Sequence, residues 1–373
     1  MTMPKPRRPL LVRGIAAAWL LLAAAVVLAL AGELWLRLEQ QRDARASKHF
    51  QDANVFFANS MELNAGNRTL WAKPWFKYRP GARAEVVAGG ERFVIQINSH
   101  GFRTHEFAVP KPPGLVRVVC IGGSTTVAGR TNEETYPALL EAKLRARHPG
   151  LPLEVLNLGV SGVSHEHWLD RLDRVFAFDP DVVVHYEAIN DLAWRQFPRF
   201  ARAHPFWRTA YRSLLYSRLF PFPLDALEPY IADSLDTLGR IASACRERGT
   251  AYLAASFAGP DPRRLGPEMK SHLDVNTEFW GRRFPLHSYA TYAAIVARYN
   301  QRFVEFVHHE HIAHVLVHER LDDPALFIDV CHFTPAGIEQ LADVFLPAVD
   351  GMVTQTAGYR SWRASARAAV ETR

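Results

Sequence analysis

Three side chains from two distant segments of the chain could together form a nucleophilic relay. Ser124 follows the apolar run 116–121 and two glycines, and Asp329 precedes His332 by three positions. A serine hydroxyl is a poor nucleophile until a base accepts its proton, which His332 could do through one ring nitrogen. Asp329 could accept the N–H of the other ring nitrogen and hold the imidazole in the required tautomer. These residue types predict acyl transfer through Ser124.

A relay of this kind also needs hydrogen-bond donors for the negative charge that develops on the acyl oxygen. Three donors are candidates: the backbone N–H of Ser124, the backbone N–H of Gly162 and the side-chain amide of Asn190. Losing one such donor typically raises the barrier by about 2.7–4 kcal/mol. Asn190 is therefore expected to matter almost as much as the three residues of the relay.

The stretch around Ser124 also has a simpler interpretation. Gly122 and Gly123 allow the backbone to turn tightly after a strand, and a helical pattern resumes only near Tyr136. We expect Ser124 in the turn between strand and helix, with an exposed hydroxyl and backbone N–H groups free to bind an anion. An ordinary Gly-Ser turn or a phosphate cradle would have the same local sequence.

The elements that must position these residues alternate between strands and helices. The expected strands are 116–121, 153–158, 181–186, 250–257 and 312–318, and the expected helices are 136–147, 165–178, 230–248, 288–308 and 335–349. Such alternation predicts right-handed βαβ crossovers and a doubly wound parallel sheet. Because parallel strands end at one edge of a sheet, the segments that carry the candidate residues are expected to converge in one crevice.

The segments at the strand ends resemble the sequence blocks of the SGNH (GDSL-like) hydrolase family. Gly-Gly-Ser-Thr at 122–125 is similar to the nucleophile block, without the Asp that usually precedes the serine. Asn-Leu-Gly-Val-Ser-Gly at 157–162 resembles the second block. Ala-Ile-Asn-Asp at 188–191 resembles the third, with Ala188 in place of the usual Gly. Asp-Val-Cys-His-Phe-Thr-Pro-Ala-Gly at 329–337 resembles the last.

This resemblance covers about residues 115–350 and implies a three-layer α/β/α fold with a five-stranded, flavodoxin-like parallel sheet. It implies a catalytic triad of Ser124, His332 and Asp329, and an oxyanion hole formed by Ser124, Gly162 and Asn190. No cofactor and no metal are expected. Asp191 is interpreted as structural, accepting hydrogen bonds that hold the Asn190 loop.

The amino-terminal sequence predicts a membrane anchor. Residues 1–13 carry four basic side chains and no acid, and residues 14–32 carry no charge. Such a length is about enough to cross a ~30 Å hydrocarbon core as a helix. The basic end is expected to stay cytoplasmic, which places the rest in the periplasm as a single-pass inner-membrane protein. A cleaved signal peptide is the alternative, because Ala29-Leu-Ala31 matches a cleavage site.

The remaining organisation follows from composition. Of the net charge of +6, most lies in the two ends of the chain, so nucleic acid is not an expected partner. The three cysteines, Cys120, Cys245 and Cys331, are expected to be buried free thiols. The predicted divisions are a basic cytoplasmic cap (1–13), a transmembrane signal anchor (14–36), a stalk and small β appendage (37–114), the hydrolase domain (115–350) and a basic tail (351–373).

Two insertions interrupt the hydrolase pattern, at 192–228 and 258–287. The first interleaves aromatic residues with arginines, which suits a packed lid, substrate contact or contact with a membrane surface. His308, His309, His311 and His314 cluster near a helix end, where exposed histidines are a better interpretation than a metal site. His165 and His167 could line the cleft, although a helix start is the safer interpretation.

The sequence therefore predicts a serine esterase that removes a short acyl group, such as acetyl, from a carbohydrate or another envelope ester. An acyltransferase acting on a glycan would use the same residues, and a lipase or lysophospholipase would suit the aromatic insertion beside a membrane. The non-enzyme alternative is an envelope-assembly or carbohydrate-binding protein on a hydrolase fold. The expected partners are an acylated glycan or lipid and the inner membrane.

Overall fold

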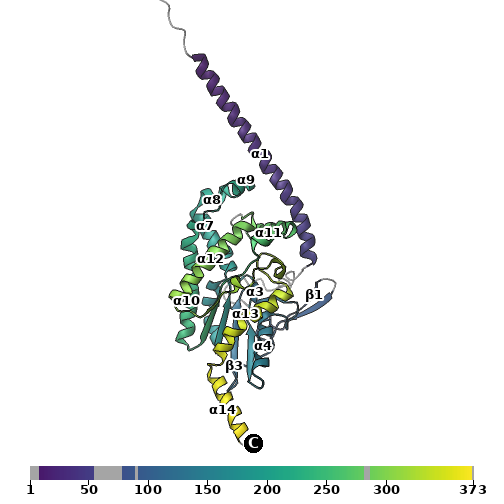
Figure 1. Cartoon of the computed structure of the whole chain (residues 1–373), viewed down its shortest axis with the longest axis vertical. Helices are drawn as coiled ribbons and strands as arrows, with labels where there is room; N and C mark the ends of the chain where they lie inside the picture. The colour runs from purple at the N-terminus through teal and green to yellow at the C-terminus, as the bar shows by residue number, and fades with distance from the viewer. Residues whose placement is uncertain (1–7, 54–77, 89–90, 281–285, 372–373) are drawn as a thin grey trace, which may run out of the picture.

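A five-stranded parallel sheet in the order β4-β3-β5-β6-β7 forms the centre of the computed structural model (Figure 1). The structure describes residues 8–53, 78–88, 91–280 and 286–371. The strands are β3 (Val116–Gly122), β4 (Leu153–Asn157), β5 (Val182–Tyr186), β6 (Ala251–Ala255) and β7 (His314–Val315). The predicted doubly wound α/β fold is confirmed.

Helices cover both faces of this sheet. On one face α4 packs with α13, and on the other α10 packs with α5 and α12. Their bounds are α4 (Tyr136–Arg147), α5 (His165–Leu169), α6 (Leu172–Phe176), α10 (Glu228–Glu247), α12 (Tyr289–His309) and α13 (Pro335–Val353). Helices therefore connect the parallel strands, as βαβ units require.

Two predicted elements differ from the structure. The helix expected at 165–178 is broken at Arg171, where the backbone leaves helical geometry (φ −131°, ψ 10°). Trp168 donates its indole N–H to the carbonyl of Gly122, so this tertiary contact of α5 overrides local helical propensity. The last strand is cut to two residues, because His318 bonds to Ser256 through Nδ1 at 2.7 Å and a short 3₁₀ turn follows.

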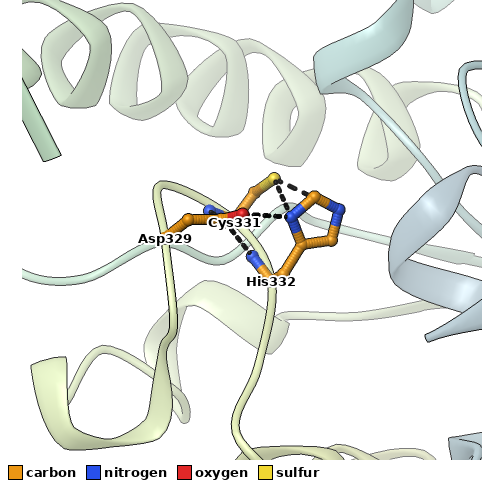
Figure 2. Close-up of side chains that lie close together, drawn as sticks. All are labelled: Asp329, Cys331 and His332. Atoms are coloured by element: carbon orange, nitrogen blue, oxygen red, sulfur yellow. Dashed lines mark hydrogen bonds and ion pairs between the residues drawn. The ribbon is translucent and has the colours of Figure 1, made fainter. Parts of the chain in front are cut away.

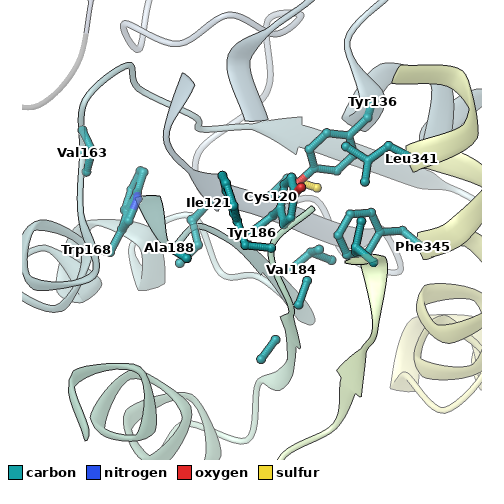
Figure 3. Close-up of a cluster of buried hydrophobic side chains, with 14 of the residues drawn as sticks. Cys120, Ile121, Tyr136, Val163, Trp168, Val184, Tyr186, Ala188, Leu341 and Phe345 are labelled. Atoms are coloured by element: carbon teal, nitrogen blue, oxygen red, sulfur yellow. The ribbon is translucent and has the colours of Figure 1, made fainter. Parts of the chain in front are cut away.

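The core lies between the sheet and its helices. Tyr136 of α4 stacks on Phe345 of α13 at 5.2 Å between ring centroids, and Tyr186 of β5 meets both (Figure 3). Tyr136, Tyr186 and Phe345 are fully buried. Since each large aromatic ring buries about 150–250 Å² of surface, this cluster holds α4 and α13 firmly on the sheet.

One charged residue interrupts the central strand. Arg117 lies in β3 with no exposed surface and forms an ion pair with Glu154 of β4. Its Nη2 donates to the carbonyl of Ala108 at 2.7 Å. Buried arginines are tolerated when they are paired and hydrogen-bonded, so Arg117 joins the segment before β3 to the sheet.

The predicted β appendage is present. β1 (Arg83–Ala88) pairs antiparallel with β2 (Glu91–Gln96), and the Gly-Gly turn between them lies outside the described residues. Arg103 follows this hairpin and donates to the carbonyls of Val127 and Gly129, both at 2.8 Å. The appendage therefore clamps the backbone just after Ser124.

The amino-terminal helix α1 spans Arg8–Ala53 without a break, so the apolar run and the expected stalk form one helix. Its segment Arg13–Asp43 is long and apolar enough to cross a membrane, and the most apolar window of it is not buried in the structure. Leu21 and Leu28 expose 73% and 72% of their surfaces. Such exposure in water would be unfavourable for so many large apolar side chains.

The first insertion is mainly helical. A π-helical turn at Asp191–Gln196 is followed by α7 (Phe197–Ala203), α8 (Pro205–Ala210), α9 (Leu214–Leu219) and a 3₁₀ turn at Leu224–Leu227. The second contains α11 (Pro267–Trp280), and residues 281–285 lie outside the description. The carboxy-terminal segment is helical as α14 (Ala357–Glu371). All three cysteines are buried free thiols, as expected.

Candidate active site

Ser124 is the first residue of the four-residue helix α3 (Ser124–Val127), directly after the two glycines that end β3. The expectation of an exposed turn residue is wrong, because Ser124 is only 4% exposed. Loops that follow neighbouring strands cover it on both sides. Asn157 Nδ2 donates to the carbonyl of Thr126 at 3.1 Å, which ties α3 to the end of β4.

The structure brings Ser124, His332 and Asp329 together. The Oγ of Ser124 lies 2.7 Å from His332 Nε2, and His332 Nδ1 lies 2.6 Å from Asp329 Oδ2. Asp329 and His332 both belong to the loop before α13, and Figure 2 shows the carboxylate and the imidazole facing each other. These distances suit direct proton transfer from the serine hydroxyl to the imidazole.

The geometry of the loop also fixes the carboxylate. Asp329 Oδ1 accepts the backbone N–H groups of Cys331 at 2.9 Å and His332 at 2.7 Å. Burial alone would raise the pKa of Asp329, but His332 and these hydrogen bonds lower it below its usual value. Asp329 is therefore ionised at neutral pH and can orient the imidazole.

Cys331 lies between the two relay residues in sequence and packs against them. Its Sγ is 3.5 Å from His332 Nδ1 (Figure 2), and burial raises the pKa of the thiol well above its usual value. Asp329, Cys331 and His332 are also the group in the described chain whose atoms lie close enough to hold a metal ion. The carboxylate and imidazole already bind each other there.

Sheet order explains why the oxyanion candidates flank Ser124. β3 lies between β4 and β5, and the chain passes from one side of β3 to the other at this point. Ligands bind at such switch points in open α/β sheets. Gly162 follows β4 and Asn190 follows β5, so their loops border the serine from opposite sides.

Gly162 lies in the turn after β4 with φ 77°, a conformation that favours glycine. Within the same turn Gly159 packs closely against α3, since a Cβ there would lie 2.8 Å from the Val127 nitrogen. Tyr78 also holds this turn, because its hydroxyl accepts the backbone N–H of Ser161 at 3.2 Å. The second block is thus fixed by both the sheet and the β appendage.

Asn190 is fully buried and its side chain is engaged on every side. Nδ2 donates to the carbonyl of Val163 at 3.2 Å and to Glu187 Oε2 at 3.0 Å. Oδ1 accepts the indole N–H of Trp194 at 3.2 Å. The amide faces Ser124's neighbour, since a Cβ added at Gly123 would lie 2.3 Å from Nδ2.

Glu187 is a residue of the site that sequence reasoning missed. Its carboxyl is 1% exposed, accepts the backbone N–H of Asn190 at 2.7 Å and contacts the Asn190 amide. Burial raises its pKa to about 8, although the hydrogen bonds from Asn190 lower it. The available signal was an acidic residue directly after the strand-like run 182–186, where burying a charge is unfavourable unless the charge is paired or hydrogen-bonded.

Ala188 and Asp191 complete this loop. Ala188, which stands where the resemblance expects Gly, is 1% exposed and lies in the hydrophobic cluster (Figure 3). Asp191 accepts hydrogen bonds from Gln196 at 3.3 Å and Arg195 at 3.5 Å, consistent with its expected structural role. The π-helical turn that begins at Asp191 directs Trp194 back toward Asn190.

A polar pocket of about 360 Å³ adjoins the Asn190 loop. Its lining comes from α5, the π-helical turn, α7 and α10: Glu166, Trp194, Arg195, Pro198, Arg199, Arg202 and Asp233. Trp194 both lines this pocket and bonds to Asn190, so the pocket and the candidate oxyanion amide share one side chain.

The other histidines have structural positions. His165 begins α5 fully buried, 3.2 Å from His185 and 3.2 Å from the Tyr299 hydroxyl, and burial lowers its pKa to about 3. His167 caps the same helix, as the helix-start interpretation predicted. Near the end of α12, the His308 ring lies 4.9 Å from the His314 ring.

Comparison with known proteins now adds to this geometry. Residues 120–339 match the GDSL-like lipase/acylhydrolase family model. The chain belongs to this family. No curated protein matches it. The matched range begins in β3 and ends in α13, so it contains every candidate site residue.

Similar solved structures include an α/β hydrolase from the metagenome of Lake Arreo, with 21% identity, a TM-score of 0.41, and 66% of this chain and 98% of that chain covered. An acetylxylan esterase from Geobacillus stearothermophilus shares 18% identity, with a TM-score of 0.41 and coverage of 63% and 94%. A GDSL-like lipase from Bacteroides thetaiotaomicron shares 13% identity, with a TM-score of 0.38 and coverage of 66% and 92%.

As a GDSL-like acylhydrolase, the chain is a carboxylic ester hydrolase. One departure from the family's nucleophile block has a structural counterpart. Gly123 stands where the block usually has Asp, and a Cβ at this position would lie 2.1 Å from Glu187 Oε2. A carboxyl group from the end of β5 therefore occupies the space beside the serine that a side chain at position 123 would need.

Proposed function

We propose that this hydrolase uses Ser124, His332 and Asp329 to remove a short acyl group, most simply acetyl, from a carbohydrate or another envelope ester. The observation that carries the proposal is the 2.7 Å contact between Ser124 Oγ and His332 Nε2. The Asp329 contact to the other ring nitrogen supports it, since a base must be held in one tautomer to accept the serine proton.

The reaction then runs in two stages. Ser124 Oγ attacks the acyl carbon while its proton passes to His332, and the imidazolium gives that proton to the departing alcohol. Water attacks the acyl-serine in the second stage, with His332 again accepting and returning a proton. The N–H groups of Ser124 and Gly162 and the Asn190 amide stabilise the oxyanion in both stages.

Two features support a short acyl group on a polar alcohol. Ser124 is 4% exposed, so a small acyl group fits beside it with less rearrangement than a long chain. The adjoining pocket carries Trp194 together with charged side chains such as Arg195 and Asp233. Sugar rings stack on aromatic faces while their hydroxyls bond to charged groups, so this lining suits a glycan.

The proposed location is the inner membrane, with α1 as a single-pass anchor and the hydrolase domain in the periplasm. Four basic residues precede the apolar run, which favours a cytoplasmic amino terminus. The unbroken helix beyond Ala31 supports retention of the anchor rather than cleavage.

Labelling with a fluorophosphonate tests the nucleophile. The full chain should react at neutral pH, and the Ser124→Ala variant should not. Labelling of both proteins, or of neither, would contradict the assignment. Rates on p-nitrophenyl esters from acetate to palmitate then test acyl length, and a preference for acetate is expected.

Two other functions use the same residues. A glycan acyltransferase would pass the acyl group to a sugar hydroxyl, and a lipase would prefer long chains because of the aromatic insertion beside α1. Free acid released from acetylated polysaccharides and from phospholipids, with and without a glycan acceptor, separates these three activities.

A further inference from the structure

The helices α8 and α9 form an arginine-rich, partly apolar surface that the proposed reaction does not use. Residues 205–220 contain three arginines, Arg208, Arg212 and Arg218, and no acidic residue. Three large apolar side chains on this pair are exposed, with Phe206 at 68%, Leu219 at 65% and Phe220 at 50%. Exposed apolar groups ringed by cations are unfavourable in water and typical of an interfacial membrane element.

Contacts between α1 and α9 fix where this surface lies. Glu33 of α1 accepts the Ser213 hydroxyl at 2.8 Å and the backbone N–H of Leu215 at 2.9 Å. Arg37 pairs with Glu33 at 2.7 Å and donates to the Arg212 carbonyl at 3.0 Å. The first turn of α9 is therefore attached to α1 immediately after its uncharged run ends.

Because α9 is attached to α1 here, α9 lies at the same depth as this part of α1 relative to a membrane that α1 would cross. Leu30, just before Glu33, is 65% exposed, and Trp35, just after it, is 62% exposed. Tryptophan is enriched at membrane–water boundaries, so the boundary on α1 falls near Gly32 to Trp35. Figure 1 shows α8 and α9 at the end of the body beside α1, with the outer part of α1 continuing past them.

We propose that α8 and α9 lie on an anionic phospholipid surface, next to the point where α1 leaves the bilayer. Phe206, Leu219 and Phe220 enter the interface, and the exposed Arg208 and Arg212 face the headgroups, while Arg218 lies 4.0 Å from the Glu39 carboxylate of α1. Positive charge near an anionic leaflet is attracted at short range, so the arginines add to the apolar contact. The inference rests on the proposed membrane anchor.

This placement has a consequence for the substrate. The carboxyl ends of the strands, which carry Ser124, lie toward the α8–α9 end of the body, and α14 lies at the opposite end (Figure 1). The catalytic edge of the sheet therefore faces the membrane side. Esters held close to the bilayer, such as glycans carried on a lipid, reach this edge more readily than soluble polymers do.

Three variants of the full chain, each with one introduced cysteine that carries a fluorophore, test the proposal. The native cysteines are buried, so a fluorophore can be attached selectively to Leu22→Cys in α1, Leu219→Cys in α9 or Ser365→Cys in α14. The proteins are placed in nanodiscs of phosphatidylcholine with and without phosphatidylglycerol. Quenching is measured with a doxyl-labelled lipid and with aqueous iodide.

The expected result is lipid quenching at positions 22 and 219 and iodide quenching at position 365. Iodide quenching at 219 together with lipid quenching at 22 would overturn the α9 contact and leave the anchor standing. Absence of lipid quenching at 22 would remove the anchor and this inference with it. The double variant Arg208→Glu, Arg212→Glu should reduce lipid quenching at 219 in anionic discs to its level in neutral discs, and an unchanged signal would contradict the role of charge.

Discussion

The two halves of the candidate site are held differently. On the proton-transfer side, Ser124, His332 and Asp329 contact one another at 2.6–2.7 Å and need no rearrangement. On the oxyanion side, the Asn190 amide is bonded to Val163 and Glu187. A substrate oxygen must share that amide with groups of the protein. We infer that kcat depends more on how freely the Asn190 amide can bond to the substrate oxygen than on the arrangement of Ser124, His332 and Asp329.

The largest expected effect comes from breaking the relay. Ser124→Ala should lower kcat by roughly 10⁴- to 10⁶-fold, because nucleophile and base act as a unit. Release of p-nitrophenol from the acetate ester measures this. Thr125→Ala is the matched control, since the adjacent hydroxyl of Thr125 is buried without a hydrogen-bond partner in the described structure. Equal losses in both variants would contradict the prediction.

Breaking the oxyanion side should cost less. Asn190→Ala removes one donor to the developing charge, so kcat should fall by about 10²–10³-fold, with KM little changed. Steady-state kinetics on a short-chain ester separates the two constants. If KM rises while kcat is unchanged, Asn190 would be a substrate-binding residue. The comparison between the proton-transfer side and the oxyanion side would then fail.

The space beside Ser124 links position 123 to position 187. Gly123→Asp should reduce activity strongly, because the new side chain meets Glu187 Oε2 and Asn190 Nδ2. Glu187→Gly should restore part of that activity when combined with Gly123→Asp, because it removes the 2.1 Å contact while the 2.3 Å contact with Asn190 Nδ2 remains. Neighbouring residues that compete for space give non-additive effects. Additive losses in the double variant would show that the two side chains do not share this space.

The raised pKa of Glu187 predicts a pH dependence. Its carboxyl has a pKa of about 8, so it is neutral below that pH and ionises above it. An anion there would oppose the oxyanion and hold the Asn190 amide more tightly, so kcat should fall as the pH rises through about 8. Besides burial, the Coulombic effect of Asp191 raises the pKa of Glu187.

Glu187→Gln should flatten this alkaline limb, and a limb that persists in the variant would assign it to another group. Stability should change as well. Because the folded-state pKa is above the unfolded value, the folded protein binds more protons between about pH 4.5 and 8. The stability that neutral Glu187 contributes is therefore lost across this window as the pH rises, and the Tm of Glu187→Gln should depend on pH less steeply.

The smallest expected effect comes from loosening the amide without removing it. Trp194→Phe deletes the indole N–H that bonds Asn190 Oδ1 at 3.2 Å. One neutral hydrogen bond is worth about 0.5–1.5 kcal/mol, so kcat should fall by a few-fold at most. Comparison with Tyr230→Phe, which removes a hydroxyl from a ring of α10 that packs against Phe200 of α7, separates this loss from general damage to the packing of the insertion.

Much of the fold could be predicted because strands and helices alternate with clear periods. The strand at 116–121 and the helix at 136–147 lie within a residue of their observed bounds. In a parallel sheet the carboxyl ends of the strands lie at one edge. For this reason Ser124, His332 and Asp329 could be predicted to lie together although they are far apart in the sequence. Their catalytic roles remain predictions that the experiments above test.

What sequence did not show depends on contacts across the fold. The burial of Ser124 involves contacts from distant segments, such as that of His332 at 2.7 Å, which no local pattern describes. The break at Arg171 follows from the contact of Trp168 with the end of β3. Glu187 was overlooked because its importance lies in its partners, Asn190 and Gly123, and these are set by strand order rather than by spacing.

The absence of a side chain at Gly123 predicts that positions 123 and 187 change together in evolution. The missing side chain leaves room for the Glu187 carboxyl, so neither residue can change alone without a collision or a void. Among descendants and ancestors of this chain, substitutions at 123 and 187 should therefore arise as a pair. A lineage that regains an acid before the serine is expected to carry a small residue at the end of β5.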